Sequence, residues 1–248
     1  MTLHGGALCV LAAVMLAAVS SASVVRMENL TPSERVWQSR ARDAEAGNGT
    51  NSEPGLTVGD PPQCRKHACP PTRVLADRGS YKEVYFPVAP YAKSRVEGKS
   101  LVPAVLDLYK RLRGYITGDN KKKQELPMTL PVILRMDLGD GGMFNPKNFT
   151  MFFYVDPSVK SPPAPNNDDI DVLDVNSYTL YIRTFSGYPV TYGDWMKELL
   201  QLAADVEADG EPYSKDYYYF ASYDPPTQLT GRINEVQLLK PHKFSSGP

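Results

Sequence analysis

Residues 216–241 read DYYYFASYDPPTQLTGRINEVQLLKP, and this stretch decides the fold of the chain. Successive side chains of a strand point to opposite faces, so we expect Tyr217 and Tyr219 on one face and Tyr218 and Phe220 on the other. Tyr218 and Phe220 should face the core, with the other pair on an outer face covered by a helix or by solvent, or the reverse. The tyrosines therefore indicate a strand and not a one-sided aromatic platform for a flat ligand.

The double proline after this strand predicts a turn. Asp224, Pro225 and Pro226 should reverse the chain before a last strand within residues 231–240. We expect Arg232 and Glu235 to hold the turn in place.

The same order of predicted strands and helix appears twice along the chain. Each copy begins with extended segments, continues with an amphipathic helix and closes with two strands. In the first copy the helix should start at Ser100 and end at Gly118, and in the second it should be capped by Asp194 and end at Gly210. The apolar positions at helical spacing are Leu101, Val105, Leu108, Leu112 and Ile116 in the first helix, and Trp195, Leu199, Leu202 and Val206 in the second.

The two helices determine the predicted fold class. Each must bury its apolar stripe on a sheet, and about eight antiparallel strands do this best as one curved sheet or barrel. The sequence therefore predicts one α+β domain with a pseudo-twofold repeat of a strands–helix–strand–strand unit, although the two copies share little sequence identity.

The N-terminus has the pattern of a secretory signal peptide. A short apolar run, residues 8–19, is followed by small residues that suit cleavage after Ala22 or Ser23. A membrane anchor is the alternative, but the run is too short and lacks a basic flank. We therefore expect a secreted, extracellular protein.

These features divide the chain into four predicted parts. Residues 1–22 are the signal peptide, and residues 23–62 are a polar, disordered leader without periodicity. Residues 63–241 form the folded domain, and residues 242–248 form a flexible tail.

The mature chain keeps two cysteines, Cys64 and Cys69, which should form a disulfide around a small loop in an oxidising compartment. Two free thiols, or half of a metal site with His67, are the alternatives. The sequons at Asn48 and Asn148 are candidates for glycosylation.

Charge and motif content exclude several classes of function. The net charge of −1 comes without a basic block, so a nucleic acid is not expected as a partner. Beyond the N-terminus there is no apolar stretch of about 20 residues, so stable membrane insertion is not expected either. No nucleophile elbow, zinc-protease motif, phosphate loop or dinucleotide fingerprint occurs, which argues against an enzyme.

Several motifs together resemble the SOUL/haem-binding family. PMTLPV at residues 127–132 resembles its K-M-T-x-P-V segment, GYITGDN at 114–120 its Y-I-x-G-x-N, and RTFSGY at 183–188 its R-x-F-x-G-[FY]. The most specific match is residues 217–240, which resemble Y-x-x-A-x-Y-[DN]-x-P-x-[KP]-x-x-x-R-x-N-E-[VI]-W-L. The chain departs from this pattern at Gln237, where Trp is usual.

The resemblance implies a distorted antiparallel β-barrel flanked by two long helices. It also implies binding of haem or another tetrapyrrole by a protein that is not an enzyme. In some members a histidine has been proposed as axial ligand, and Tyr85 aligns with it; tyrosinate can ligate ferric iron, while a packing role is the alternative.

Other members bind in a hydrophobic groove along the first helix. This groove maps onto Leu106, Tyr109, Leu112 and Arg113, with Lys110 nearby, and either cation would pair a propionate. The alternative is that Leu112 faces the sheet and that the two cations lie on a solvated face. The resulting interpretation is a secreted haem carrier or scavenger, and its rival is an extracellular interaction or signalling protein with vestigial haem binding.

Overall fold

The structure is a computed structural model that describes residues 62–98, 100–139, 143–144, 146, 148–225 and 227–241. The predicted signal peptide, nearly all of the predicted leader, the Asn48 sequon and the predicted tail lie outside these residues. The described elements, in chain order, are η1 (Pro62–Cys64), β1 (Arg73–Asp77), β2 (Lys82–Phe86), β3 (Ala89–Glu97), α3 (Leu101–Ile116), β4 (Val132–Asp137), β5 (Asn148–Tyr154), β6 (Ile170–Val175), β7 (Tyr178–Ser186), α4 (Tyr192–Ala208), β8 (Tyr217–Ser222) and β9 (Ile233–Lys240).

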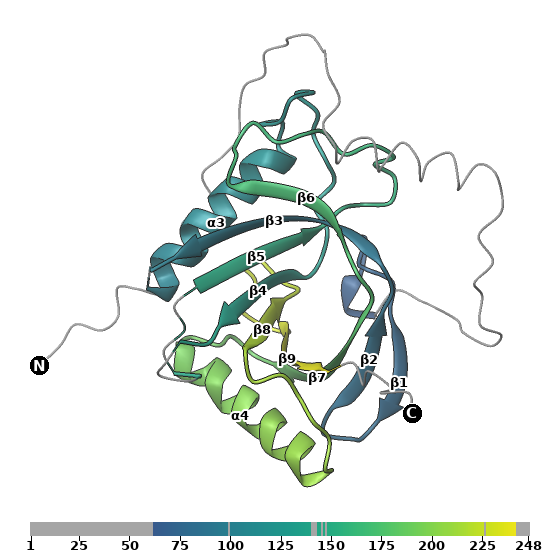
Figure 1. The fold of residues 1–248 in the computed structure, drawn as a ribbon, viewed down its shortest axis with the longest axis vertical. Coiled ribbons are helices and arrows are strands. Elements are labelled where there is room, and N and C mark those ends of the chain that lie inside the picture. The colour runs from purple at the N-terminus through teal and green to yellow at the C-terminus, as the bar shows by residue number, and fades with distance from the viewer. Residues whose placement is uncertain are drawn as a thin grey trace, which may run out of the picture.

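The described strands form one antiparallel sheet of nine strands in the order β1-β2-β7-β9-β8-β4-β5-β3-β6. Figure 1 shows that the sheet curls into a half-barrel with both helices on its outer face. Strands β1 and β6 are its two edges, so the described sheet is open where a closed barrel was expected. The α+β class with an antiparallel sheet and two flanking helices is confirmed.

The predicted order of elements is present in both halves, as β3-α3-β4-β5 and as β7-α4-β8-β9. Pairing between β4 and β8 joins the halves into one sheet. The strand before each of these units pairs with the other half: β2, which precedes β3, pairs with β7, and β6, which precedes β7, pairs with β3. The pseudo-twofold repeat itself stays a prediction.

Helix α3 forms where apolar residues recur at helical spacing. Its buried side chains are Ala104, Leu108, Leu112, Tyr115 and Ile116, which pack with β3 and β5 in the main core. Ser100 stands at the N-cap position as predicted, but its side chain makes no capping hydrogen bond.

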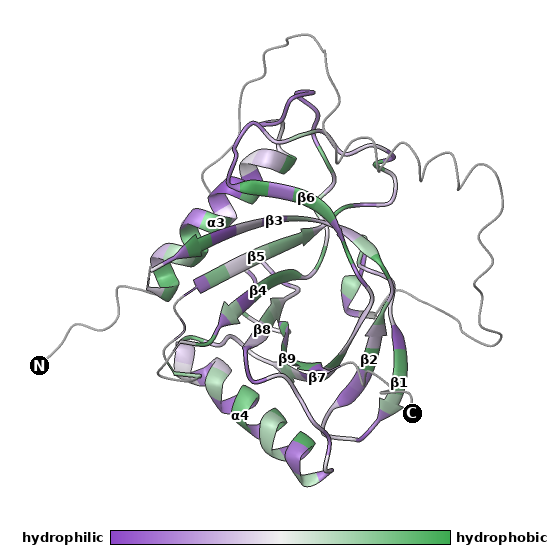
Figure 2. Ribbon diagram, in the orientation of Figure 1, coloured by the Kyte–Doolittle hydropathy of each residue, from purple (hydrophilic) through white to green (hydrophobic). Residues whose placement is uncertain are grey.

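Helix α4 begins with a capping box. The Thr191 side chain accepts from the Asp194 amide, and the Asp194 carboxylate accepts from the Thr191 amide. The prediction that Asp194 is the cap was therefore wrong by three positions, because Asp194 occupies N3 and Thr191 is the cap. Hydrophobic and hydrophilic residues alternate along this helix (Figure 2), and its apolar face covers β7 and β9. None of the described helices is long and apolar enough to cross a membrane.

The tyrosine-rich strand is β8. Tyr218 and Phe220 are buried against α4, where the Trp195 ring stacks on Phe220 with centroids 4.6 Å apart. Tyr217 and Tyr219 point to the other, concave face of the sheet and are half-buried. The predicted alternation is confirmed, and the helix covers the Tyr218 side of the strand.

Candidate functional site

The predicted disulfide between Cys64 and Cys69 is present. Its loop is fixed to distant parts of the chain: Arg65 forms an ion pair with Asp224 at 2.7 Å, and Gln63 Nε2 donates to Glu235 Oε1 at 2.9 Å. The loop and the residue before it are therefore joined to the turn before β9 and to β9 itself.

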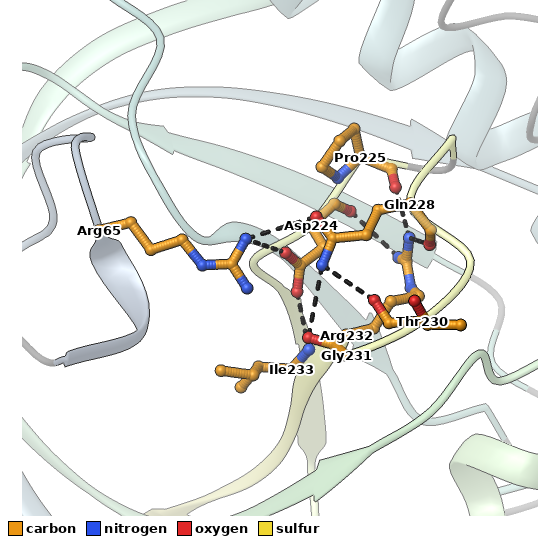
Figure 3. Close-up of polar contacts among 8 residues, drawn as sticks. All are labelled: Arg65, Asp224, Pro225, Gln228, Thr230, Gly231, Arg232 and Ile233. Carbon is orange, nitrogen blue, oxygen red and sulfur yellow. Dashed lines mark hydrogen bonds and ion pairs between the residues drawn. The ribbon is translucent and has the colours of Figure 1, made fainter.

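Figure 3 shows how the turn between β8 and β9 is held. The Arg232 guanidinium donates to the carbonyl oxygens of Asp224, Pro225 and Gln228, which confirms its predicted role. Glu235 does not take part, since it lies inside the sheet. Asp224 has that role instead, because its Oδ2 accepts from the Ile233 amide at 2.7 Å.

Four predicted ligand residues do lie together on α3. Leu106, Tyr109, Lys110 and Arg113 fall within an arc of about 100° of the helix at 3.6 residues per turn. Leu106, Tyr109 and Arg113 are half-buried, while Lys110 is exposed. We call these four residues the α3 face.

The two cations of the α3 face are not engaged elsewhere, because neither Lys110 nor Arg113 forms an ion pair with any described residue. Asp107 and Arg111, by contrast, pair with each other on another side of the helix. The α3 face can therefore offer two positive charges to an anionic ligand.

Tyr109 gives the α3 face an aromatic surface. Its ring meets the edge of Phe153 in β5 with centroids 6.0 Å apart. Burial raises the pKa of the Tyr109 hydroxyl, and the charge of Arg113 opposes that increase. The phenol is therefore neutral at physiological pH and can serve as a contact surface and hydrogen-bond donor.

Leu112 does not belong with these residues. It lies about 120° around the helix from Leu106 and is fully buried in the core. The prediction that it lines a surface groove was wrong, because the helix needs this side chain for packing against the sheet.

Tyr85 is also apart from the α3 face. It lies in β2, opposite Arg73 of β1 and Thr179 of β7, and the Arg73 guanidinium lies 5.1 Å from its ring centroid. Helix α3 packs on β3 and β5, at the other end of the strand order. The two haem sites expected from the sequence are therefore separate, and Tyr85 cannot ligate a haem bound on α3.

Asn148 is the first residue of β5, opposite Glu97 and Asp137, and is half-buried. Its glycosylation stays a prediction.

The sequence reasoning missed the polar groups inside the curled sheet. Glu235 and Gln237 alternate along β9 with Val236 and Leu238, which face the helices, so both polar side chains point to the concave face. The departure at Gln237 from the usual Trp was the available signal.

Comparisons with known proteins agree with the motif pattern. The family model described as "SOUL heme-binding protein" matches residues 67–239. The chain belongs to this family. "Heme-binding protein 2" of Homo sapiens is 30% identical over 164 residues, covering 65% of this chain and 78% of the relative. "Heme-binding protein 1" of Mus musculus is 30% identical over 174 residues, covering 68% and 91%.

Among solved structures, the crystal structure of the EcmrR C-terminal domain is similar over 64% of this SOUL-family chain and 96% of its own, with a TM-score of 0.47 and 12% identity.

The α3 face fits part of what a haem requires. Leu106 and Tyr109 offer apolar contact to a macrocycle, and Lys110 and Arg113 can pair with its propionates. None of the four is a histidine, cysteine or methionine, and burial disfavours the tyrosinate form of Tyr109. The α3 face would therefore hold the ligand by its periphery and not by its iron.

Proposed function

We propose that this protein binds haem or a related tetrapyrrole on the α3 face, as a secreted carrier or scavenger without catalytic activity. The observation that carries the proposal is the pair of cations, Lys110 and Arg113, that have no ion-pair partner among the described residues and lie beside half-buried Leu106 and Tyr109. Membership of the SOUL family and relatives named heme-binding proteins support the choice of ligand.

The α3 residues have distinct roles in this proposal. Lys110 and Arg113 form charge-assisted hydrogen bonds with the propionates and so orient the macrocycle. Leu106 and Tyr109 cover part of one face of the ring and exclude water from it. Such a site gives moderate affinity and reversible release, as a carrier needs.

The secreted location is supported by two features. The N-terminal sequence has a signal-peptide pattern, and a disulfide is typical of proteins that fold in an oxidising compartment. The lack of known catalytic motifs in the sequence supports a binding role.

A titration of the purified mature chain with hemin tests the proposal. We expect a saturable but broad Soret band, because no strong axial ligand lies on the α3 face. The double variant Lys110→Ala/Arg113→Ala should bind at least about tenfold more weakly, since it loses two charge-assisted contacts. Lys197→Ala, which removes an exposed lysine of α4, is the matched control and should bind like the wild type. A titration without saturation, or equal affinity in the double variant, contradicts the proposal.

Two leucines of the same helix separate binding from stability. Leu106→Ala should weaken hemin binding and leave the urea midpoint almost unchanged. Leu112→Ala should lower the free energy of unfolding by about 2–5 kcal/mol, because it leaves a cavity in the core. If Leu106→Ala affects only stability, Leu106 belongs to the core and the site is not on α3.

An extracellular interaction or signalling protein with vestigial haem binding is the second candidate. The burial of Leu112 favours it, because a residue expected in the groove is used by the core. Failure of the wild type to bind hemin would select this candidate.

A further inference from the structure

The concave face of the sheet is rich in tyrosine. Tyr91 lies edge-on to Tyr154 with ring centroids 5.7 Å apart, and its hydroxyl is 3.3 Å from that of Tyr178. Tyr219 packs against the apolar residues around both Tyr91 and Tyr178. Tyr223 follows on the same face after β8. This face is opposite the one that both helices cover.

Glu235 brings a carboxylate into these tyrosines. It is 2% exposed and accepts from Gln63 Nε2 and Gln237 Nε2, each at 2.9 Å. The Tyr223 hydroxyl is a third donor. All three donors are neutral, and within the described part of the chain no cation pairs with this carboxylate. Burial raises the pKa of Glu235, while the three hydrogen bonds oppose that increase.

Gln237 adds a second acceptor, and this one has no hydrogen-bond partner among the described residues. Its side chain is 3% exposed, and its Oε1 has no hydrogen-bond partner in the described residues. Gln237 lies two residues after Glu235 in β9 and directly opposite Tyr219 in β8. A buried amide oxygen of this kind is costly unless a donor or a positive charge reaches it.

We propose that the concave face of the sheet binds a small organic cation between Glu235, Gln237 and the ring of Tyr219. A monocation would supply the positive charge that the buried carboxylate lacks, and the half-buried rings of Tyr178 and Tyr219 would offer it their negative π faces. Its positive charge would also satisfy Gln237 Oε1. The site is distinct from the α3 face, which lies on the outer side of the sheet.

Gln63, next to the disulfide loop, contacts this site. Gln63 precedes Cys64 and donates to the carboxylate that the cation would approach. A bound cation therefore competes with the amide of Gln63, and the loop limits how tightly the cation binds.

Isothermal titration calorimetry of the mature chain with benzyltrimethylammonium tests the proposal. We expect saturable binding of this cation and none of phenylmethanesulfonate, which has the same ring and the opposite charge. Glu235→Gln keeps the shape of the side chain and should weaken binding at least about tenfold. Glu83→Gln is the matched control, because Glu83 is also buried but lies on the outer face and pairs with Lys240; it should bind normally.

Two further variants keep the test decisive if Glu235→Gln folds poorly. Tyr219→Leu retains bulk without a π face and should weaken binding several-fold, while Gln63→Ala removes the competing donor and should strengthen it. Lys110→Ala/Arg113→Ala should bind the cation normally, which separates this site from the haem site. Absence of binding to the wild type, equal binding of the anion, or unchanged binding in both Glu235→Gln and Tyr219→Leu would overturn the proposal.

Discussion

The carboxylate of Asp224 lies between two partners that are far apart in sequence. Its Oδ1 pairs with Arg65 of the disulfide loop at 2.7 Å, and its Oδ2 accepts from the Ile233 amide at 2.7 Å. The Asp224 side chain is fully buried, whereas Arg65 is half-exposed. Asp224 thus holds the turn before β9 and fixes the disulfide loop to it (Figure 3).

We predict that Asp224→Ala lowers the free energy of unfolding by about 2–3 kcal/mol, because the half-buried Ile233 amide loses its acceptor and the loop loses its ion pair. Urea unfolding measures the change. Asp168→Ala, at an exposed position, should stay within about 0.5 kcal/mol of the wild type. A similar loss in both variants would show that the contacts of Asp224 are not the cause.

The disulfide should stabilise the fold modestly. Closing so short a loop removes unfolded-state entropy worth about 2 kcal/mol. The double variant Cys64→Ser/Cys69→Ser should lose about that amount in urea unfolding, and only the wild type should respond to a reducing agent. A variant as stable as the oxidised wild type would contradict this expectation.

The two helix N-termini provide a matched pair. Thr191→Ala removes a cap that accepts a backbone hydrogen bond, and we expect it to lower the free energy of unfolding by about 1 kcal/mol. Ser100→Ala removes an N-cap side chain that makes no such bond, so its loss of stability should be smaller. Thermal unfolding of both variants checks the order, and the reverse order would contradict it.

The raised pKa of Glu235 predicts that the difference in stability between the wild type and Glu235→Gln depends on pH. A carboxyl whose pKa is higher in the folded state binds its proton more tightly there, so its contribution to stability is present at low pH and is lost as pH rises through the folded pKa. Glu235→Gln cannot ionise and should therefore gain stability relative to the wild type as pH rises from the ordinary value of 4.5. Urea unfolding of both proteins across this range measures it. A pH-independent difference would show that Glu235 ionises as easily in the folded chain as in the unfolded one.

Local patterns predicted the elements well. Periodicity identified both helices, and alternation placed Tyr218 and Phe220 in the core, because both signals depend on neighbours within one element. The grouping of Leu106, Tyr109 and Arg113 came from the family resemblance. Leu112 was misplaced in it, because core packing and ligand contact compete for the residues of one helix.

Relationships that depend on strand order could not be predicted. Tyr85 was expected near a haem, but β2 pairs with β7 and so lies far along the sheet from α3. The burial of Glu235 depends on Gln63, 172 residues earlier in the chain. Neither contact leaves a local pattern in the sequence.

The crossed pairings of β2 and β6 have a mechanical consequence. Each half of the chain contributes a strand to the other, since β2 pairs with β7 and β6 pairs with β3. A protease that cuts the connector between Asp156 and Ile170 would break the covalent chain. The two fragments would stay associated, because each contributes strands that pair with strands of the other in the one sheet.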